Sequence, residues 1–340
     1  MVNENEVMIT SKQNATSARL SLDKGYVRTL VELAVISVVM MIAARFFRMY
    51  RITDFMVFII FVLSFDLLYG YMGHLSFGHM LYFGSGTYAS AIFMNRVSGN
   101  PLLGIAAGIL FAALLALVLG ALVMKTHGAA FALINMGFNQ IGFFMVVSGL
   151  SSVTRGDDGM SVFINPLGSI HLGNERVLFY VVLGSLLAVF YFLKRLTKSS
   201  FGVMVRSIHE NENRVKFLGY NTYRYKITTF VISCAIAGFA GTLTTINYGF
   251  ISPGFIDSFQ NVSPIFAVLM GGAGNLYGAV IGGMIYKFLS EYIAIYISAW
   301  ELFFGMALLI MVFRFRTGVV GFVTTAHEKL MKKQSGGGLK

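Results

Sequence analysis

The chain has 340 residues, of which 56% are hydrophobic and 12% are charged, and its mean hydropathy is +0.72. Because soluble globular proteins are about 25% charged, this composition excludes a water-soluble enzyme and indicates a protein that crosses the membrane several times. The 26 Lys and Arg residues outnumber the 15 Asp and Glu residues. In a membrane protein such an excess of basic residues is typical of cytoplasmic loops. We therefore expect the chain to contact membrane lipid and not nucleic acid.

The apolar runs predict an all-α membrane fold, a polytopic helical bundle of about ten transmembrane segments. A helical crossing takes ~20 residues, and short loops leave room for about that many crossings. The polar residues 1–25 do not form a compact signal peptide, so the first apolar run is expected to be retained. The predicted segments are 27–44, 55–70, 74–94, 101–124, 129–149, 176–195, 227–250, 259–272, 275–295 and 298–313.

Basic residues predict which side each loop faces. Eight of them lie between residues 194 and 226, and six more follow residue 313. Four segments separate these two regions, so both can be cytoplasmic, with both chain termini on that side and the loop 150–175 outside. Arg45, Arg48 and Arg51 do not fit, because the count places them outside. The expected parts are a cytoplasmic segment (1–25), a transmembrane domain (26–316) that includes the loop 196–226, and a cytoplasmic tail (317–340).

Glycines interrupt two apolar runs at equivalent places in the two halves of the chain. Irregular backbone inside a membrane is tolerated only against protein or water, so a pair of broken helices indicates a transport pathway. Close packing of neighbouring helices is the alternative, because small residues let helices approach. The glycines are Gly70, Gly73 and Gly78 in the first run and Gly271, Gly272 and Gly274 in the second.

The sequence has no phosphate-binding loop of the G-x-x-x-x-G-K-[ST] type and no dinucleotide-binding fingerprint. His74 and His79 are spaced poorly for a shared metal and are expected to serve packing or hydrogen bonding. Asp157 and Asp158 are expected to form a surface turn. We therefore expect no catalytic residue, no metal site and no cofactor in this chain.

The loop after Arg195 carries an amphipathic pattern, with apolar residues at 204, 205, 208, 215 and 218. This spacing predicts a short helical pair, with Asn213 as N-cap of the second helix and Gly219 as its C-terminal cap. Such a helix either seats in a groove of a soluble partner or rests on anionic lipid headgroups.

Several separated motifs together resemble one known family, the membrane subunits of ATP-binding-cassette importers of the branched-chain amino acid type. The resemblance runs from about residue 55 to 322, and the order and spacing of the motifs agree. They are LLYGYMGHLSFGH at 67–79, AFALI at 130–134, GDDGM at 156–160, FGVMVRSIHENENR at 201–214, LGYN at 218–221, YK at 225–226, AGFAG at 237–241 and MGGAGNLYG at 270–278.

The resemblance implies a permease subunit that pairs with a homologous second membrane subunit. Two cytoplasmic ATPase subunits, which bind the ATP and Mg, and an external solute-binding protein would complete the importer. It also implies that residues 207–219 form the coupling helix that inserts into an ATPase groove, which favours partner docking over lipid contact. The residues expected to serve this coupling are Arg206, His209, Glu210, Glu212, Asn213, Arg214 and Gly219.

Two positions depart from the family pattern and bear on the solute. Asp66 stands where the family usually has asparagine, and Gln140 stands where it often has an acidic residue. A charge within a span costs about 2.5–3.5 kcal/mol, so Asp66 is expected either on the pathway or an interface, or hydrogen-bonded to the broken backbone nearby. Asn135, Asn139 and Gln140 either face the substrate route or join helices.

The full set of expected pathway residues is Asp66, Ser76, Asn135, Asn139, Gln140 and Asn275. The expected function is ATP-driven alternating access for a small polar solute, with branched-chain or other amino acids as the first choice. Urea or small carboxylates are alternatives within the same class of importer. A secondary transporter that uses Asp66 and Glu291 as ion sites, a channel and an intramembrane enzyme are the rivals.

Overall fold

The computed structural model describes residues 27–166, 171–296, 302 and 305–306, and these are almost entirely helical. They divide into two compact units, Met1–Arg48 and Met49–Lys340, of which the first contributes the helix Val27–Phe46. The predicted N-terminal segment and tail, and all but three residues of the predicted segment 298–313, lie outside the described residues.

The second unit is a succession of helices with two very short strands. Their order is α2 (Met49–Asp66), η1 (Leu67–Tyr71), α3 (His79–Arg96), α4 (Pro101–Val123), α5 (Gly128–Phe144), η2 (Met145–Gly149), α6 (Ser151–Thr154), η3 (Gly156–Asp158), β1 (Met160–Ser161), α7 (Glu175–Lys198), α8 (Ser200–Phe217), α9 (Thr222–Tyr248), β2 (Phe250–Ile251), η4 (Pro253–Ile256), η5 (Ser258–Asn261), α10 (Val262–Gly271) and α11 (Leu276–Tyr296).

The predicted all-α membrane fold is confirmed. Among the described residues six helical stretches are long and apolar enough to cross a membrane, and these are Val27–Phe46, Met49–Tyr71, Pro101–Val123, Gly128–Gly149, Glu175–Lys198 and Thr222–Tyr248. The count of about ten stays a prediction. In the predicted segment 259–272 the α-helix α10 has only ten residues, and the last turn of η5 precedes it. Ten residues reach ~15 Å, half of a ~30 Å hydrocarbon core, so α10 does not cross on its own.

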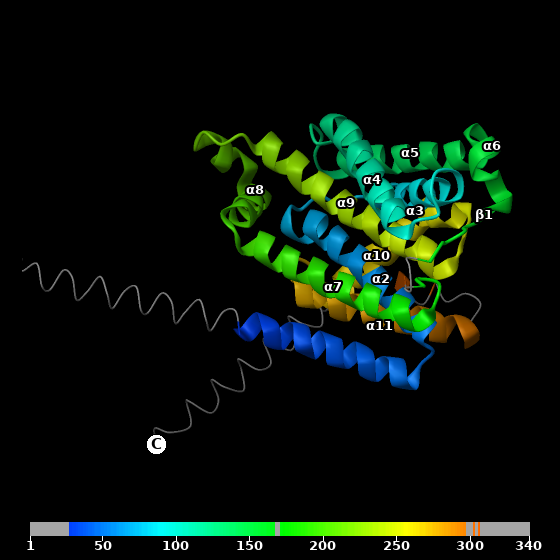
Figure 1. Ribbon diagram of the computed structural model, residues 1–340. Helices are drawn as coiled ribbons and strands as arrows, with labels where there is room; N and C mark the ends of the chain where they lie inside the picture. Colours follow the sequence, from blue (N-terminus) through cyan, green and yellow to red (C-terminus); the bar gives the residue numbers. More distant parts are fainter. Residues whose placement is uncertain (1–26, 167–170, 297–301, 303–304, 307–340) are drawn as a thin grey trace, which may run out of the picture. The chain divides into compact units, whose positions relative to one another are not determined.

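The core of the second unit is built around α2 and α9. In the apolar window of α2, 89% of the residues are buried, and in that of α9 67%, whereas α4 and α5 bury only 22% and 28%. Isoleucine, valine and phenylalanine line α2 on all sides, as expected of a helix enclosed by others. In Figure 1, α2 and α9 run through the middle of this unit, between α7 and α11 on one side and α3, α4 and α5 on the other.

Small residues allow α3, α4 and α9 to approach closely. A Cβ on Gly86 of α3 would lie 2.3 Å from the carbonyl oxygen of Gly238 in α9. A Cβ on Gly241 would lie 2.1 Å from the carbonyl oxygen of Phe83. The AGFAG motif at 237–241 therefore serves helix packing, which is the usual role of small residues in a membrane bundle.

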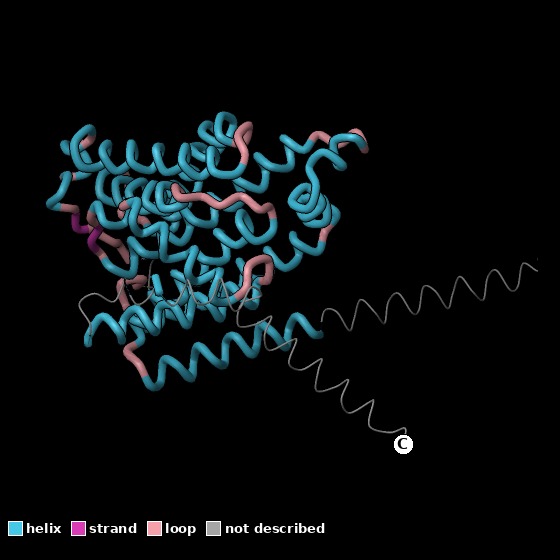
Figure 2. Tube along the Cα trace, turned by 180° about the vertical axis from the view of Figure 1, so that it is seen from behind, coloured by secondary structure: helices cyan, strands magenta, loops and turns pink. Residues whose placement is uncertain are grey.

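The two ends of the second unit differ in structure. Figure 1 places α8 at one end and α6 with β1 at the other, and Figure 2 shows the same separation from behind. The strands pair antiparallel, with Met160 opposite Ile251. Asp157 and Asp158 are exposed in the turn η3 beside them, as expected.

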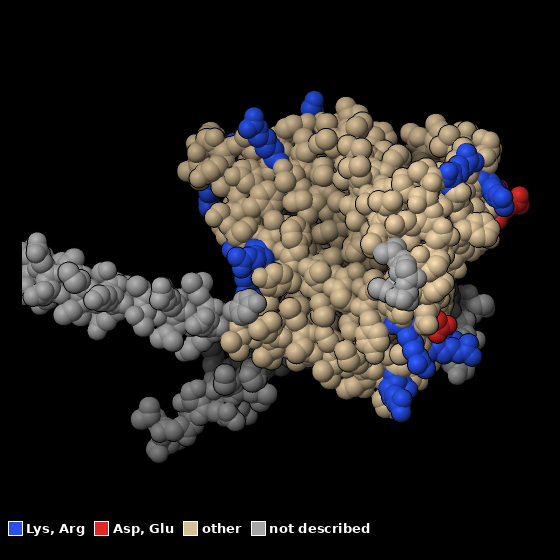
Figure 3. Space-filling view, in the orientation of Figure 1, with Lys and Arg blue, Asp and Glu red and all other residues tan. Residues whose placement is uncertain are grey.

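The long sides of the second unit are apolar. On α4 and α5, residues such as Leu110, Val118 and Leu133 are 60–64% exposed. The face seen in Figure 3 carries its Lys and Arg side chains toward the two ends, with few charges between them. This distribution fits a helical unit whose middle faces hydrocarbon.

Candidate coupling and translocation site

The helix α8 is divided in two by a kink at Asn211. Ser199 caps its start, because the Ser199 side chain accepts a hydrogen bond from the backbone N–H of Gly202. Asn211 has non-helical dihedral angles, and its side-chain oxygen accepts a hydrogen bond from the N–H of Arg214 at 2.9 Å. The predicted helical pair is therefore present, but its second N-cap is Asn211 and the expected cap Asn213 is wrong.

The second half of α8 ends at Gly219, as predicted. Gly219 has a φ of +85°, a left-handed conformation that glycine adopts without strain. Its N–H donates to the carbonyl oxygen of Lys216, and the N–H of Tyr220 donates to that of Val215. The turn directs the chain back into α9.

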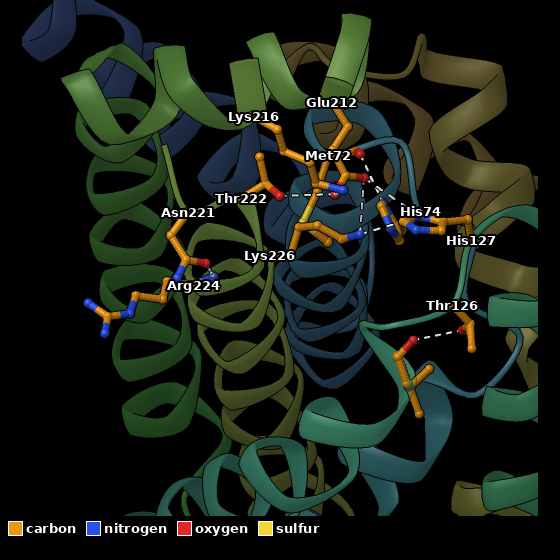
Figure 4. A network of polar contacts seen from close by, with 11 residues as sticks. Met72, His74, Thr126, His127, Glu212, Lys216, Asn221, Thr222, Arg224 and Lys226 are labelled. Atoms are coloured by element: carbon orange, nitrogen blue, oxygen red, sulfur yellow. Dashed lines mark hydrogen bonds and ion pairs between the residues drawn. The ribbon is translucent and has the colours of Figure 1, made fainter. Parts of the chain in front are cut away.

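A polar network around Glu212 holds α8 onto the rest of the protein (Figure 4). One carboxylate oxygen accepts a hydrogen bond from the Thr222 hydroxyl at 3.0 Å and pairs with the Lys216 ammonium at 2.9 Å. The other oxygen pairs with the Lys226 ammonium at 3.3 Å and lies 3.6 Å from Nδ1 of His127. Glu212 thus joins α8 to α9 and to the connection between α4 and α5.

The surroundings of Glu212 stabilise its charged form. Partial burial raises the pKa of Glu212, but its interactions with Lys216, Lys226 and Thr222 outweigh burial and bring the pKa to about 2. The side chain of Lys226 is only 2% exposed, so its ammonium depends on Glu212 for compensation. Glu212 is therefore ionised at neutral pH.

The first half of α8 lies directly on the first helix break. The Arg206 guanidinium stacks over the Tyr71 ring, 4.7 Å from its centroid. The His209 ring fills the space beside Gly73, where a Cβ would lie 2.3 Å from Cδ2 of His209. This half of α8 therefore contacts both the end of η1 and the residues that follow it.

The tip of α8 exposes apolar side chains. Phe217 is 91% exposed, Leu218 70% and Tyr220 48%, next to Arg214 on the exposed side. Glu210 and Asn213 are also exposed, whereas Val205, Ile208 and Val215 are buried against the protein. A cluster of large apolar side chains at such a tip marks a contact surface.

Both glycine-rich stretches are breaks between helices. The first comprises the π-helical turn η1, which includes Gly70, and the following residues 72–78, with Gly73 at a φ of +77° and Gly78 as the N-cap of α3. The second separates α10 from α11, with Gly271 ending α10 and Gly272 and Gly274 at φ values of +108° and +75°. The positive φ values need glycine, because a Cβ would be strained there.

The two breaks contact each other, and Asp66 joins them. The Asp66 carboxylate, which is fully buried, accepts a hydrogen bond of 2.8 Å from the N–H of Gly274. Gly70 lies between them, and a Cβ at Gly70 would lie 2.1 Å from both Oδ1 of Asp66 and the nitrogen of Gly274. The second carboxylate oxygen of Asp66 has no hydrogen-bond partner among the described residues. Asp66 is therefore hydrogen-bonded to irregular backbone, but this backbone belongs to the second break and not to the nearby first break, where it was expected.

The expected strip on α5 divides into buried and exposed parts. Asn139 is fully buried, donates to the carbonyl oxygen of Ile256 at 2.6 Å and accepts from the Asn261 side chain at 2.9 Å. Asn261 in turn accepts a hydrogen bond from the N–H of Met80. Asn139 therefore joins α5 to η4 and η5. Of the two roles considered for this residue, its contacts agree with joining helices.

The other four expected pathway residues, on α5 and in the breaks, make different hydrogen bonds. Asn135 is buried and donates to the carbonyl oxygen of Phe131 within its own helix. Gln140 is exposed and accepts a hydrogen bond from the Ser258 hydroxyl. Ser76 is buried within the first break and accepts from the N–H of Gly78, and Asn275 in the second break accepts from the N–H of Tyr277 at the start of α11. The structure thus brings Asp66 together with Gly70 and Gly274, whereas Gln140 is exposed on α5.

The two histidines of the first break have separate environments. His79 is buried, its Nε2 lies 3.0 Å from the Ser64 hydroxyl, and its ring packs on Phe61 and Phe65. Nδ1 of His74 lies 3.0 Å from the carbonyl oxygen of Met72. Among the described residues there is no group of three or more histidine, cysteine or acidic side chains placed to hold a metal ion.

Sequence reasoning missed four residues of this region. Lys226 and His127 were not expected beside Glu212, because they are 14 and 85 residues away along the chain and only packing brings them together. Phe217 and Leu218 were not named as contact residues. Their signal was present, since both lie next to Gly219 at the end of an otherwise polar turn.

Residues 47–313 match the family model described as the permease component of the branched-chain amino acid transport system. The chain is similar to the permease proteins LivM of Escherichia coli K12 (26% identical, over 68% of this chain and 60% of LivM) and LivM of Methanocaldococcus jannaschii (29%, over 64% and 67%). It is also similar to LivH of Salmonella typhimurium (27%, over 76% and 89%). The match thus spans about 60% of the length of the first of these relatives, and no solved structure is similar at a significant level.

Proposed function

The chain belongs to the family of branched-chain amino acid transport permease components, and we propose that it is one membrane subunit of an ATP-driven importer. It is a multi-pass membrane protein, and its relatives are transport permeases, which are not enzymes. In the proposed importer it pairs with a homologous membrane subunit in a prokaryotic plasma or inner membrane, with both termini cytoplasmic. Two cytoplasmic ATPase subunits bind ATP and Mg, and an external protein delivers the solute.

The observation that carries this proposal is the arrangement of buried and exposed side chains on α8. Its buried face is fixed by Glu212, its first half lies on the first helix break, and its apolar tip is exposed. A helix with this arrangement is suited to seat Phe217 and Leu218 in a groove of a partner and to pass the partner's motion inward.

The proposed mechanism follows the contacts from α8 inward. Closure of the ATPase subunits displaces α8, and Arg206 and His209 transmit the displacement to the end of η1. Asp66 links η1 to the second break, so the two broken helices shift together. The broken helices alternate between two packed arrangements, and each arrangement opens the path to one side of the membrane.

The proposed solute is a branched-chain or other amino acid, in agreement with the names of the relatives. Importers of urea or small carboxylates are the alternatives of the same class. An ion-gradient transporter would not require an exposed apolar docking tip, so α8 favours the ATP-driven reading.

Replacing Phe217 with aspartate tests the docking role of the tip. We expect the variant to lose about tenfold or more of the ATPase subunit that co-purifies with the wild-type chain, because an aromatic anchor that docking would bury is replaced by a charge. The matched control is Phe163→Asp, since Phe163 is 73% exposed in the loop after β1, at the other end of the protein. Equal recovery of the ATPase with both variants would contradict docking through this tip.

A further inference from the structure

A cavity of about 500 Å³ lies at the end of the second unit that is opposite α8. Tyr248 in its wall is the last residue of α9, whose first residue, Thr222, contacts Glu212 of α8. The 27 residues between these ends extend ~40 Å, about the thickness of a bilayer. The size of the cavity is within the range of sites for small molecules.

Three charged side chains line this cavity, and they leave one carboxylate unpaired. Asp54 of α2 pairs with the ammonium of Lys287 in α11 and accepts a hydrogen bond from the Tyr248 hydroxyl at 3.2 Å, so both of its oxygens are used. Glu291 lies one helical turn after Lys287, on the same face of α11. Among the described residues Glu291 makes no hydrogen bond or ion pair within 4 Å. Two carboxylates and one ammonium line the cavity, and Arg51, which is not part of the lining, lies close enough to attract Glu291 electrostatically.

The rest of the cavity is aromatic with hydroxyl groups at its rim. The Lys287 ammonium lies 5.4 Å from the centroid of the Phe58 ring, which stacks on Tyr286. Phe61 and Phe83 pack on each other deeper in the wall. The remaining polar groups include the hydroxyls of Ser263 and Ser290.

We propose that this cavity binds an aliphatic α-amino acid by its ammonium group, with Glu291 as the accepting carboxylate. The inference rests on the proposed function and names where the permease itself recognises its solute. A lysine ammonium has three donors, so Lys287 keeps donors for the carboxylate of the solute after pairing with Asp54. The aromatic wall at Phe58 and Phe61 takes the aliphatic side chain. The carboxylates of Asp54 and Glu291 repel a carboxylate that lacks an ammonium group, which favours amino acids over small carboxylates as solutes.

The first test uses the wild-type complex in lipid nanodiscs without the soluble solute-binding protein. Binding is measured for L-leucine, for isoamylamine, which lacks the carboxylate, and for 4-methylpentanoate, which lacks the ammonium group. We expect L-leucine to bind best, isoamylamine to bind measurably, and 4-methylpentanoate to bind at least tenfold more weakly than isoamylamine. Binding of 4-methylpentanoate as strong as that of isoamylamine would overturn the proposal.

The second test replaces Glu291 with glutamine, which keeps the shape and removes the charge. We expect binding of L-leucine and isoamylamine to weaken about tenfold or more, and Glu291→Asp to restore part of the loss. The matched control is Glu175→Gln, an exposed position at the start of α7 that does not line the cavity. Thermal unfolding of each variant shows whether the fold is kept.

The outcomes separate this inference from the proposed function. If the complex imports an amino acid with ATP but Glu291→Gln binds and transports it like the wild type, the cavity is not the site and the importer assignment stands. If the wild-type complex imports no amino acid with ATP, the proposed function fails first. If Glu291→Gln does not fold, the selectivity of the wild-type complex between isoamylamine and 4-methylpentanoate decides.

Discussion

Replacing Gly70 with alanine is expected to abolish transport and to lower the free energy of unfolding by about 3 kcal/mol or more. The new Cβ would lie 2.1 Å from the nitrogen of Gly274 and 2.8 Å from its Cα, and backbone atoms cannot move aside as a flexible side chain can. The two breaks would have to separate, with loss of the hydrogen bond between Asp66 and Gly274. Overpacking costs about 1–3 kcal/mol and a hydrogen bond to a charged group about 1.5–3 kcal/mol.

The measurement is ATP-driven uptake by the reconstituted complex, together with thermal unfolding of the purified complex. Gly184→Ala is the matched control, because Gly184 is an exposed helical glycine of α7 where a Cβ would meet nothing within 4 Å. We expect this control to keep uptake and to gain up to about 1 kcal/mol from helix propensity. Wild-type uptake and stability in Gly70→Ala would show that the close contact of the two breaks is not required.

Replacing Glu212 with glutamine is expected to lower the free energy of unfolding by about 2–3 kcal/mol and to loosen α8. Breaking a buried pair by removing one partner costs about 3–5 kcal/mol, and the 19% exposure of Glu212 reduces that figure. Lys226 would be left nearly buried without its counter-charge. Chemical denaturation gives the stability, and faster hydrogen exchange of the α8 amides reports the loosening.

Glu210→Gln is the control for this stability measurement, since Glu210 lies on the same helix but its side chain is exposed. We expect a change within about 0.5 kcal/mol, as for surface positions generally. A loss of stability as large as that of Glu212→Gln would mean that the change of charge on α8, and not the pairing with Lys226, sets the effect.

The contribution of Glu212 also has a defined pH dependence. Its pKa is lowered from 4.5 to about 2 in the folded protein, so its stabilisation is present above pH 4.5 and is lost as the pH falls toward 2. The difference in stability between wild type and Glu212→Gln is therefore expected to shrink between pH 4.5 and pH 2. A difference that grows over this interval would have the wrong sign for a pKa lowered by ion pairing.

Local sequence signals predicted the parts of the structure that are themselves local. The glycines at 70–78 and 271–274 predicted two helix breaks. Several of these positions have positive φ angles or close backbone contacts, which few residue types other than glycine can adopt. The apolar spacing after residue 201 predicted a helical pair that ends at Gly219. The cap of the second helix was predicted at the wrong asparagine, since Asn211 and Asn213 are equally suited by residue type and only the structure shows that Asn211 caps.

Contacts between distant segments could not be predicted from the sequence. Asp66 was expected near its own break, but its partner Gly274 is 208 residues away. Glu212 was expected to face a partner protein, and only the folded structure turns it inward to Lys226 and Thr222. Likewise, the residue type of Asn139 suits a substrate pathway, but the side chain forms hydrogen bonds with Ile256 and Asn261, which lie more than 100 residues later in the chain.

Energy coupling of solute uptake is the most direct test of the central claim, that this chain provides the path while separate subunits hydrolyse ATP. The complete complex is reconstituted in liposomes with its solute-binding protein and an ionophore that removes all ion gradients. We expect uptake of L-leucine or another amino acid with ATP and none with a non-hydrolysable analogue. Uptake that persists with the analogue, or that the purified chain alone carries out, would contradict the account.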